Sequence, residues 1–141
     1  MRVITLTGAG LLMVLSAFSI KHHSKSSQSP LLYDTKWYLT TIHSSSSINN
    51  INGKTIFIKF NRSTNSAGGK GGCNSFGSTI AVNNNDLDFR DIFSTKMYCE
   101  GMQTTEDTFL KDLQEVNRFE IKDKSLFLYH DGIVLLEFNK Q

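Results

Sequence analysis

Apolar and polar residues alternate in several short runs, the pattern typical of strands that bury one face. In residues 36–42 (KWYLTTI) the alternation places Trp37, Leu39 and Thr41 on one side. The strands expected from such runs are residues 36–42, 54–60, 78–82, 87–89, 118–122, 125–130 and 133–138. Residues 61–72 are polar and rich in glycine, so we expect a turn or an open loop there.

Residues 103–116 (QTTEDTFLKDLQEV) predict a helix. Its apolar side chains recur at helical spacing and define one face: Phe109, Leu110, Leu113 and Val116. Thr104 or Thr105 is expected to cap the N-terminus. Glu106 and Asp107 then fall in the first turn, where the helix dipole favours negative charge.

The three strands after this helix are separated by short turns, one of them at Asp131 and Gly132. An Asp-Gly pair is among the strongest short signals for a hairpin, so these strands should form an antiparallel meander. The whole pattern predicts an α+β fold. We expect an antiparallel, strongly curved β-sheet, a partial barrel, with one main helix covering its apolar face.

The first residues have the pattern of an export signal. A short positive start is followed by an apolar run, and Ala17 and Ser19 fit a small-x-small cleavage rule with the cut before Ile20. We therefore expect residues 1–19 to be a signal peptide, with an uncleaved membrane anchor as the alternative. Residues 20–33 should be a flexible linker and residues 34–138 the folded domain. No cysteine lies near the end of the apolar run, so a lipoprotein anchor is not expected there.

Composition excludes several classes of protein. The chain has 141 residues, enough for one domain, and 39% of them are hydrophobic, which supplies one core. The net charge is only +2 and no dense lysine or arginine stripe occurs, so we expect no nucleic-acid partner. We expect a monomer without a cofactor.

The two cysteines, Cys73 and Cys99, are most simply a disulfide in an exported protein. Closing that loop would stabilise the fold by roughly 3–4 kcal/mol on the chain-entropy model. A redox pair and a nucleophilic cysteine are the alternatives. A nucleophile would need a base, for which the domain offers His43 and His130.

Other motifs are incomplete. Gly53-Lys54-Thr55 lacks the first glycine of a phosphate-binding loop, because Ile48 stands in its place. Asp86, Asp88 and Asp91 lack the glycine and glutamate of a calcium loop, so we expect a solvated strand face and no metal site.

The motif GGCNSFGS, the segment STKMYC and the glutamate that leads the FLKDL helix resemble the META/HslJ-like domain family, in the same order, over residues 34–138. The residues that match are Trp37 and Leu39 in the first strand, Gly72, Cys73, Asn74 and Phe76 in a turn, Thr95, Met97 and Cys99 in the next segment, and Glu106 in the helix. The resemblance implies a small bacterial envelope protein, associated in some members with stress, with no established catalytic activity.

The matching residues have expected structural roles. Gly71, Gly72 and Gly77 should allow positive φ around Cys73. Asn74 should hydrogen-bond its own backbone and hold that turn. A loop that contacts a ligand is the alternative interpretation of this segment. Met97 and Tyr98 are expected to be packing residues rather than part of a recognition surface.

Three functions follow as hypotheses. The first is a non-enzymatic exported protein of the cell envelope or periplasm that binds another envelope protein, with membrane association through its N-terminal segment. The second is a carrier of a small apolar or lipid-like ligand, suggested by the ten Phe residues. The third is a hydrolase that uses Cys73 or Cys99 with His130.

Overall fold

The computed structural model describes residues 31–46 and 56–140. Within these ranges the chain forms eight strands and one helix. In chain order they are β1 (Lys36–Ile42), β2 (Phe57–Asn61), β3 (Ser66–Lys70), β4 (Ser75–Asn83), β5 (Asp86–Ser94), α1 (Gln103–Glu115), β6 (Arg118–Lys122), β7 (Ser125–His130) and β8 (Ile133–Lys140). The expected segment 1–19, residues 20–30 of the expected linker and residues 54–55 of the second expected strand lie outside the described residues.

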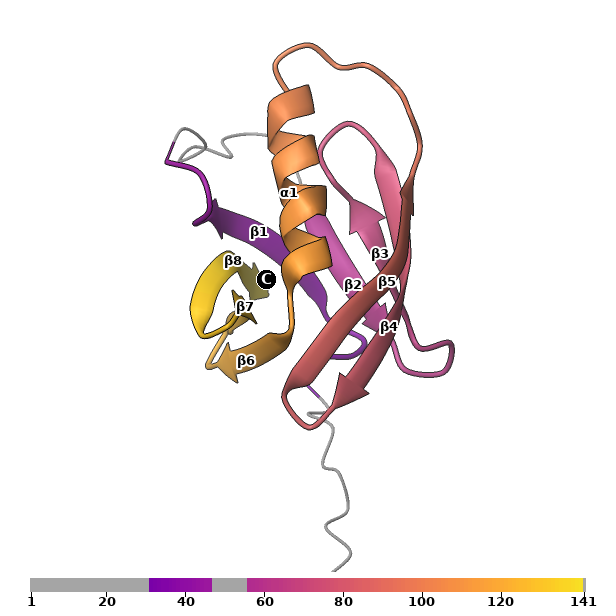
Figure 1. Cartoon of the computed structure of the whole chain (residues 1–141). Helices are drawn as coiled ribbons and strands as arrows, with labels where there is room; N and C mark the ends of the chain where they lie inside the picture. The colour runs from indigo at the N-terminus through magenta and orange to yellow at the C-terminus, as the bar shows by residue number, and fades with distance from the viewer. Residues whose placement is uncertain (1–30, 47–55, 141) are drawn as a thin grey trace, which may run out of the picture.

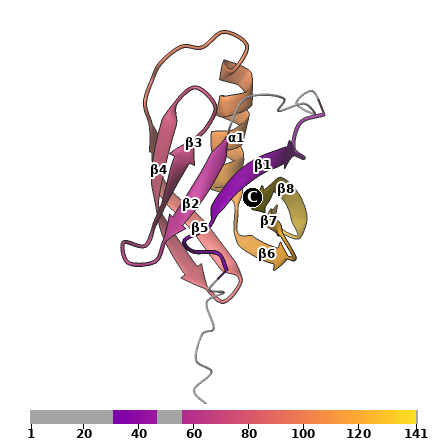
Figure 2. The same cartoon turned by 180° about the vertical axis from the view of Figure 1, so that it is seen from behind.

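The strands close into an antiparallel barrel in which each strand pairs with its neighbour in sequence and β1 pairs with β8 (Figures 1 and 2). The helix α1 packs against the β5 and β8 sides of this barrel. The predicted α+β fold, a curved antiparallel sheet with one covering helix, is therefore confirmed. No described helix is long and apolar enough to cross a membrane.

The strands β5 and β6 have the shortest pairing in the barrel. Asp86 and Arg118 are the single residue pair recorded between these two strands, whereas β4 pairs with β5 as far as Ser94. Beyond Asp86, β5 therefore has β4 as its strand neighbour on one side and α1 on the other.

Large apolar side chains fill the barrel interior. Those with almost no exposed surface include Trp37, Phe60, Phe109, Phe119 and Phe138. On the predicted helix face, Phe109, Leu113 and Val116 are buried, and Leu110 is half-buried. Burial of this face supplies the main driving force for docking the helix, since removing apolar surface from water is worth roughly 25 cal/mol per Å².

The packed domain begins earlier than the predicted boundary at residue 34. Leu32 and Tyr33 are buried, and the Leu32 carbonyl accepts a hydrogen bond of 3.1 Å from the Trp37 indole. Residues 31–33 therefore belong to the folded part and not to a linker.

The expectation of an open loop over residues 61–72 is wrong for residues 66–70, which form β3. This strand runs between β2 and β4, and a Cβ on Gly69 would overlap the Phe57 carbonyl oxygen of the neighbouring strand. Glycine here permits close approach of two backbones, whereas glycine-rich composition alone indicates a turn.

Several element ends also differ from the sequence expectations. The strands β4 and β5 extend well beyond residues 78–82 and 87–89. Residue 102 takes the N-cap position of α1 without a side-chain hydrogen bond, so the expected cap by Thr104 or Thr105 is wrong. At the last hairpin, Asp131 and Gly132 both have positive φ, the backbone that the Asp-Gly signal predicts.

Candidate functional site

A disulfide and a buried hydrogen-bond network join two loops to the start of α1. The disulfide links Cys73, in the turn between β3 and β4, to Cys99, in the loop between β5 and α1, with the two Cα atoms 5.9 Å apart. The predicted disulfide is thus confirmed. It fixes the β5–α1 loop, residues 95–102, against the rigid barrel.

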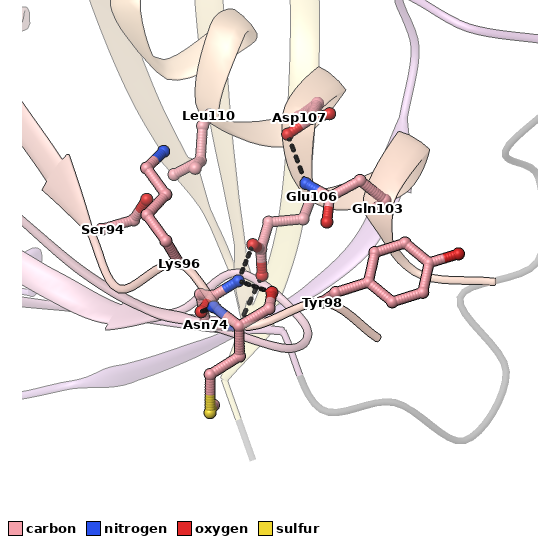
Figure 3. Close-up of a pocket in the computed structure, with 9 residues that line it drawn as sticks. Asn74, Ser94, Lys96, Tyr98, Gln103, Glu106, Asp107 and Leu110 are labelled. Carbon is pink, nitrogen blue, oxygen red and sulfur yellow. Dashed lines mark hydrogen bonds between the residues drawn. The ribbon is translucent and has the colours of Figure 1, made fainter. Parts of the chain in front are cut away.

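Asn74 is the centre of the network. Its main-chain N–H donates to Glu106 Oε2 and its side-chain amide donates to Glu106 Oε1, both over 2.6 Å. The same amide donates to the Met97 carbonyl over 2.9 Å. Its oxygen accepts hydrogen bonds of 2.8 Å from the Thr95 hydroxyl and the Met97 N–H. Both the oxygen and the nitrogen of this side chain are therefore bonded. Figure 3 shows Asn74 beside Glu106.

The sequence predicted that the Asn74 side chain holds its own turn, and this prediction is wrong. The turn is closed by the main chain, where Gly71 N–H donates to the Asn74 carbonyl over 2.8 Å. The Asn74 side chain instead reaches to Glu106 and to the β5–α1 loop. Glu106 is buried, with 2% of its surface exposed, in the first turn of α1, where the helix dipole stabilises its charge.

Of the three glycines expected to need positive φ, only Gly72 has it, with φ of 134°. A Cβ on Gly72 would also overlap the end of the Met102 side chain. Gly77 has a different role, because a Cβ there would lie 2.5 Å from the ring of Phe93. Phe93 therefore lies over Gly77 on the outside of the barrel.

The remaining predicted structural residues lie in the core. Trp37, Leu39 and Phe76 are buried, and the Phe76 ring meets Phe109 of α1 edge to face with centroids 5.4 Å apart.

The expectation that Met97 and Tyr98 are packing residues is wrong. Met97 is 60% exposed and Tyr98 is 79% exposed, and the nearby Phe93 is 70% exposed. The Met97 main chain is bound by Asn74 while its side chain stays outside. Large apolar residues exposed at three positions within residues 93–98, at the end of β5 and in the fixed loop after it, are typical of an interaction surface.

A groove runs between this loop and α1. A pocket of about 140 Å³ lies over the network, and a second of about 410 Å³ lies between the end of β5 and the helix. Ser94, Lys96, Asp107 and Leu110 line both pockets, so the two adjoin. Figure 3 shows the residues that line the smaller one. Lys111 lines the larger one. We call the two pockets together the β5–α1 groove.

Two lysines, Lys96 and Lys111, and one carboxylate, that of Asp107, line the larger pocket of the groove. Neither Lys96 nor Lys111 has an ion pair among residues 31–46 and 56–140. Asp107 accepts a hydrogen bond of 2.9 Å from the Gln103 side chain, and Glu106 is enclosed by Asn74. The lining of the larger pocket therefore carries two positive charges and one negative charge, a net charge of +1, beside the apolar side chain of Leu110.

A buried acid lies farther along α1. Asp112 accepts a hydrogen bond of 2.5 Å from the Ser44 hydroxyl, which follows β1. Burial raises the pKa of Asp112 above its usual value, while the Ser44 hydrogen bond and the Lys111 charge oppose that rise. This pair ties α1 to the barrel and is separate from the groove.

The chemistry that a cysteine hydrolase needs is not assembled. Both sulfur atoms are in the disulfide, so neither is available as a nucleophile. His43 pairs with Glu137 at 3.4 Å, and the His130 ring contacts the Glu115 carbonyl at the far end of α1. Asp86, Asp88 and Asp91 are exposed on β5, and the described residues hold no cluster of metal-ligating side chains.

The groove residues Phe93, Lys96 and Lys111 are the ones that sequence reasoning missed. A weak signal was present, since Phe93, Met97 and Tyr98 are large apolar residues around a lysine in a stretch without strand alternation. Nothing in the sequence placed Lys111 beside them.

Comparison with known proteins gives a family and a fold. The family model of the META domain matches residues 30–141. A solution NMR structure of a protein from Burkholderia xenovorans is similar, with a TM-score of 0.63, 20% identity, and coverage of 98% of this chain and 99% of that chain. A second NMR structure gives a TM-score of 0.60 and 17% identity over 77% of this chain and 91% of that chain. At these identities the likeness shows the fold alone. No curated protein matches.

Proposed function

The chain belongs to the META domain family, and on that premise we propose that it acts as an exported, non-enzymatic binding module whose binding surface is the β5–α1 groove and its rim. The observation that carries this proposal is the exposure of Phe93, near the end of β5, and of Met97 and Tyr98 in the fixed loop that follows. Soluble domains rarely leave such residues together in water unless another molecule covers them.

Rigidity of the loop supports this role. The disulfide to Cys73 and the hydrogen bonds from Asn74 order the loop before any partner arrives. A preordered loop avoids the entropy cost of ordering side chains and backbone on binding, which strengthens the complex.

The other two hypotheses have less support. A carrier of an apolar ligand would need interior room, but the barrel interior holds large side chains such as Trp37 and Phe109. A cysteine hydrolase would need a free thiol, and both are paired.

Export is the second part of the proposal, and the disulfide supports it, because such bonds persist mainly in oxidising compartments. The test is the denatured mass of the protein from its own cells, alkylated before reduction. We expect a chain that lacks residues 1–19, or retains them as an anchor, with both cysteines protected. Alkylated Cys73 and Cys99 would contradict export.

The binding surface is tested by photo-cross-linking in those same cells. Benzoylphenylalanine replaces Phe93 or Tyr98 in the full chain, and Ile133 is the matched control. Ile133 is also exposed, at 67%, but it pairs with His130 near the other end of α1. We expect discrete adducts from positions 93 and 98 and none from 133. No adducts, or the same adducts from all three positions, would overturn the proposal.

A further inference from the structure

The second half of β5 leaves one backbone edge open. After Asp86 this strand has no β6 residue recorded opposite it, and α1 lies beside it with the larger pocket between them (Figure 1). An open strand edge is a template for pairing with another extended chain.

The hydrogen bonds show which backbone groups face the pocket. Thr95 N–H donates to the Ser75 carbonyl over 3.0 Å, and Met97 N–H donates to the Asn74 side chain over 2.8 Å. In an extended chain, alternate residues direct their N–H and C=O groups to opposite sides. The backbone groups of Ser94 and Lys96 therefore turn away from β4 and toward the groove, and both residues line both pockets.

A β-bulge limits how much of the edge is usable. The register between β4 and β5 shifts between Gly77 and Thr79, and Ser78 Oγ donates to the Arg90 carbonyl over 2.7 Å at this irregularity. Asp91 there has a φ of 51°. A bulge interrupts regular pairing and bends its strand. The stretch that follows the bulge comprises the end of β5, Phe93 and Ser94, and the first residues of the β5–α1 loop, as far as Lys96.

The side chains around this edge indicate which charge and which apolar groups an occupant of the groove should carry. Lys96, Lys111 and Asp107 give the larger pocket two positive charges and one negative charge, and neither lysine has an ion pair with a described residue. The net charge of its lining is therefore +1, which favours a negative group on the occupant. Leu110 forms an apolar floor and Phe93 an apolar rim. A volume of about 410 Å³ lies within the roughly 300–1,000 Å³ range of ligand pockets.

We propose that the β5–α1 groove binds a short extended segment of another polypeptide, which adds as a strand to the backbone of Ser94 and Lys96 and places an acidic side chain against Lys96 and Lys111. This inference rests on the proposed function and names the class of its partner. In strand addition the main-chain hydrogen bonds supply affinity, and pockets for alternate side chains supply specificity.

The probe is a random nine-residue peptide library displayed on phage and selected on the full, disulfide-intact chain. Counter-selection uses the Lys96→Glu/Lys111→Glu double variant, whose circular dichroism and melting temperature should match the unsubstituted protein. We expect enriched peptides with a conserved Asp or Glu. Lys96→Gln with Lys111→Gln should weaken their binding roughly tenfold and flatten its dependence on salt.

N-methylation of the enriched peptide separates strand addition from binding by side chains alone. A methyl group removes one backbone donor, so we expect binding to weaken about tenfold at alternate residues and to change less than about twofold between them. Equal effects at all positions, or none, would overturn strand addition. Failure to enrich any acidic peptide would overturn the partner class. Cross-links from Phe93 and Tyr98 to an envelope protein would leave the binding function standing in either case.

Discussion

The carboxylate of Glu106 accepts two hydrogen bonds of 2.6 Å from Asn74, one from its main chain and one from its side-chain amide. Through this contact the start of α1 is fixed to the turn between β3 and β4. Because Asn74 also binds Thr95 and both main-chain groups of Met97, a single side chain positions the helix and the loop that precedes it.

Replacement of Asn74 should therefore be costly. Asn74→Ala leaves the buried Glu106 carboxylate with one donor fewer and removes the partners of Met97. We expect the free energy of unfolding to fall by about 2–4 kcal/mol, measured by urea denaturation. Asn61→Ala is the control, since Asn61 is exposed and accepts from the neighbouring Ser63, and it should cost less than about 1 kcal/mol. Equal losses in the two variants would contradict the prediction, because the buried Asn74 contacts would then add no more stability than those of an exposed turn.

Reduction of the disulfide should lower the free energy of unfolding of the domain, while the barrel stays folded. The cysteines are 26 residues apart, for which the chain-entropy model gives about 3.5 kcal/mol. We expect a reductant to lower the urea midpoint of the unsubstituted protein. The Cys73→Ser/Cys99→Ser variant should start at the lower midpoint and not respond to reductant. A midpoint that is unchanged on reduction of the native protein would contradict this prediction.

The pH dependence of stability should report the buried Asp112. Burial raises the pKa of its carboxyl group in the folded state, so the folded protein binds this proton more tightly than the unfolded chain. The contribution of Asp112 is fully present below its unfolded pKa and is lost as pH rises through its folded pKa. Asp112→Asn keeps a group that accepts from Ser44 and removes the buried charge, so the variant should gain stability relative to the native protein at neutral pH.

The measurement is the urea midpoint of both proteins from pH 3 to pH 8. The difference should be small at the acid end, where Asp112 is protonated, and should grow toward neutral pH. Asp107→Asn serves as the control, because it removes an exposed carboxylate from the same helix. A variant that parallels the native protein across the whole range would contradict the assignment to Asp112.

Local patterns in the sequence predicted the elements whose partners lie nearby in the chain. The strands β1, β6 and β7 have the expected bounds, and a tight turn joins the last two. In β1, Trp37 and Leu39 are buried as expected, but a β-bulge after Leu39 buries Ile42 rather than Thr41. The disulfide followed from an even pair of cysteines in a chain with an export pattern. Hydrophobic periodicity and turn chemistry carry this information without reference to the rest of the fold.

The features that the sequence did not reveal depend on contacts between distant segments. Gly69 stands in a strand because the Phe57 backbone approaches it, and that approach exists only in the assembled barrel. Met97 and Tyr98 have the composition of core residues, but the hydrogen bonds from Asn74 hold the loop so that both side chains face outward. Lys96 and Lys111 meet at one groove only because α1 folds back along β5.

The turn at Gly72 should tolerate a side chain poorly. Comparison with Gly101 separates the effect of backbone conformation from that of the overlap with Met102. Gly72 and Gly101 both have positive φ, 134° and 72° respectively. A Cβ at Gly101 meets nothing within 4 Å, whereas one at Gly72 overlaps Met102. Gly101→Ala should therefore cost about 1–2 kcal/mol, the penalty for an L-residue in the left-handed region. Gly72→Ala should cost more, because its φ lies outside that region and Met102 must move.

Urea denaturation of the two glycine variants, alone and combined with Met102→Ala, separates the two causes. Removing the Met102 side chain relieves the overlap but not the backbone strain, so Gly72→Ala should cost less in the Met102→Ala background than in the native one. The cost of Gly101→Ala should be the same in both backgrounds. If the cost of Gly72→Ala is also unchanged, backbone strain alone explains the requirement for glycine beside Cys73.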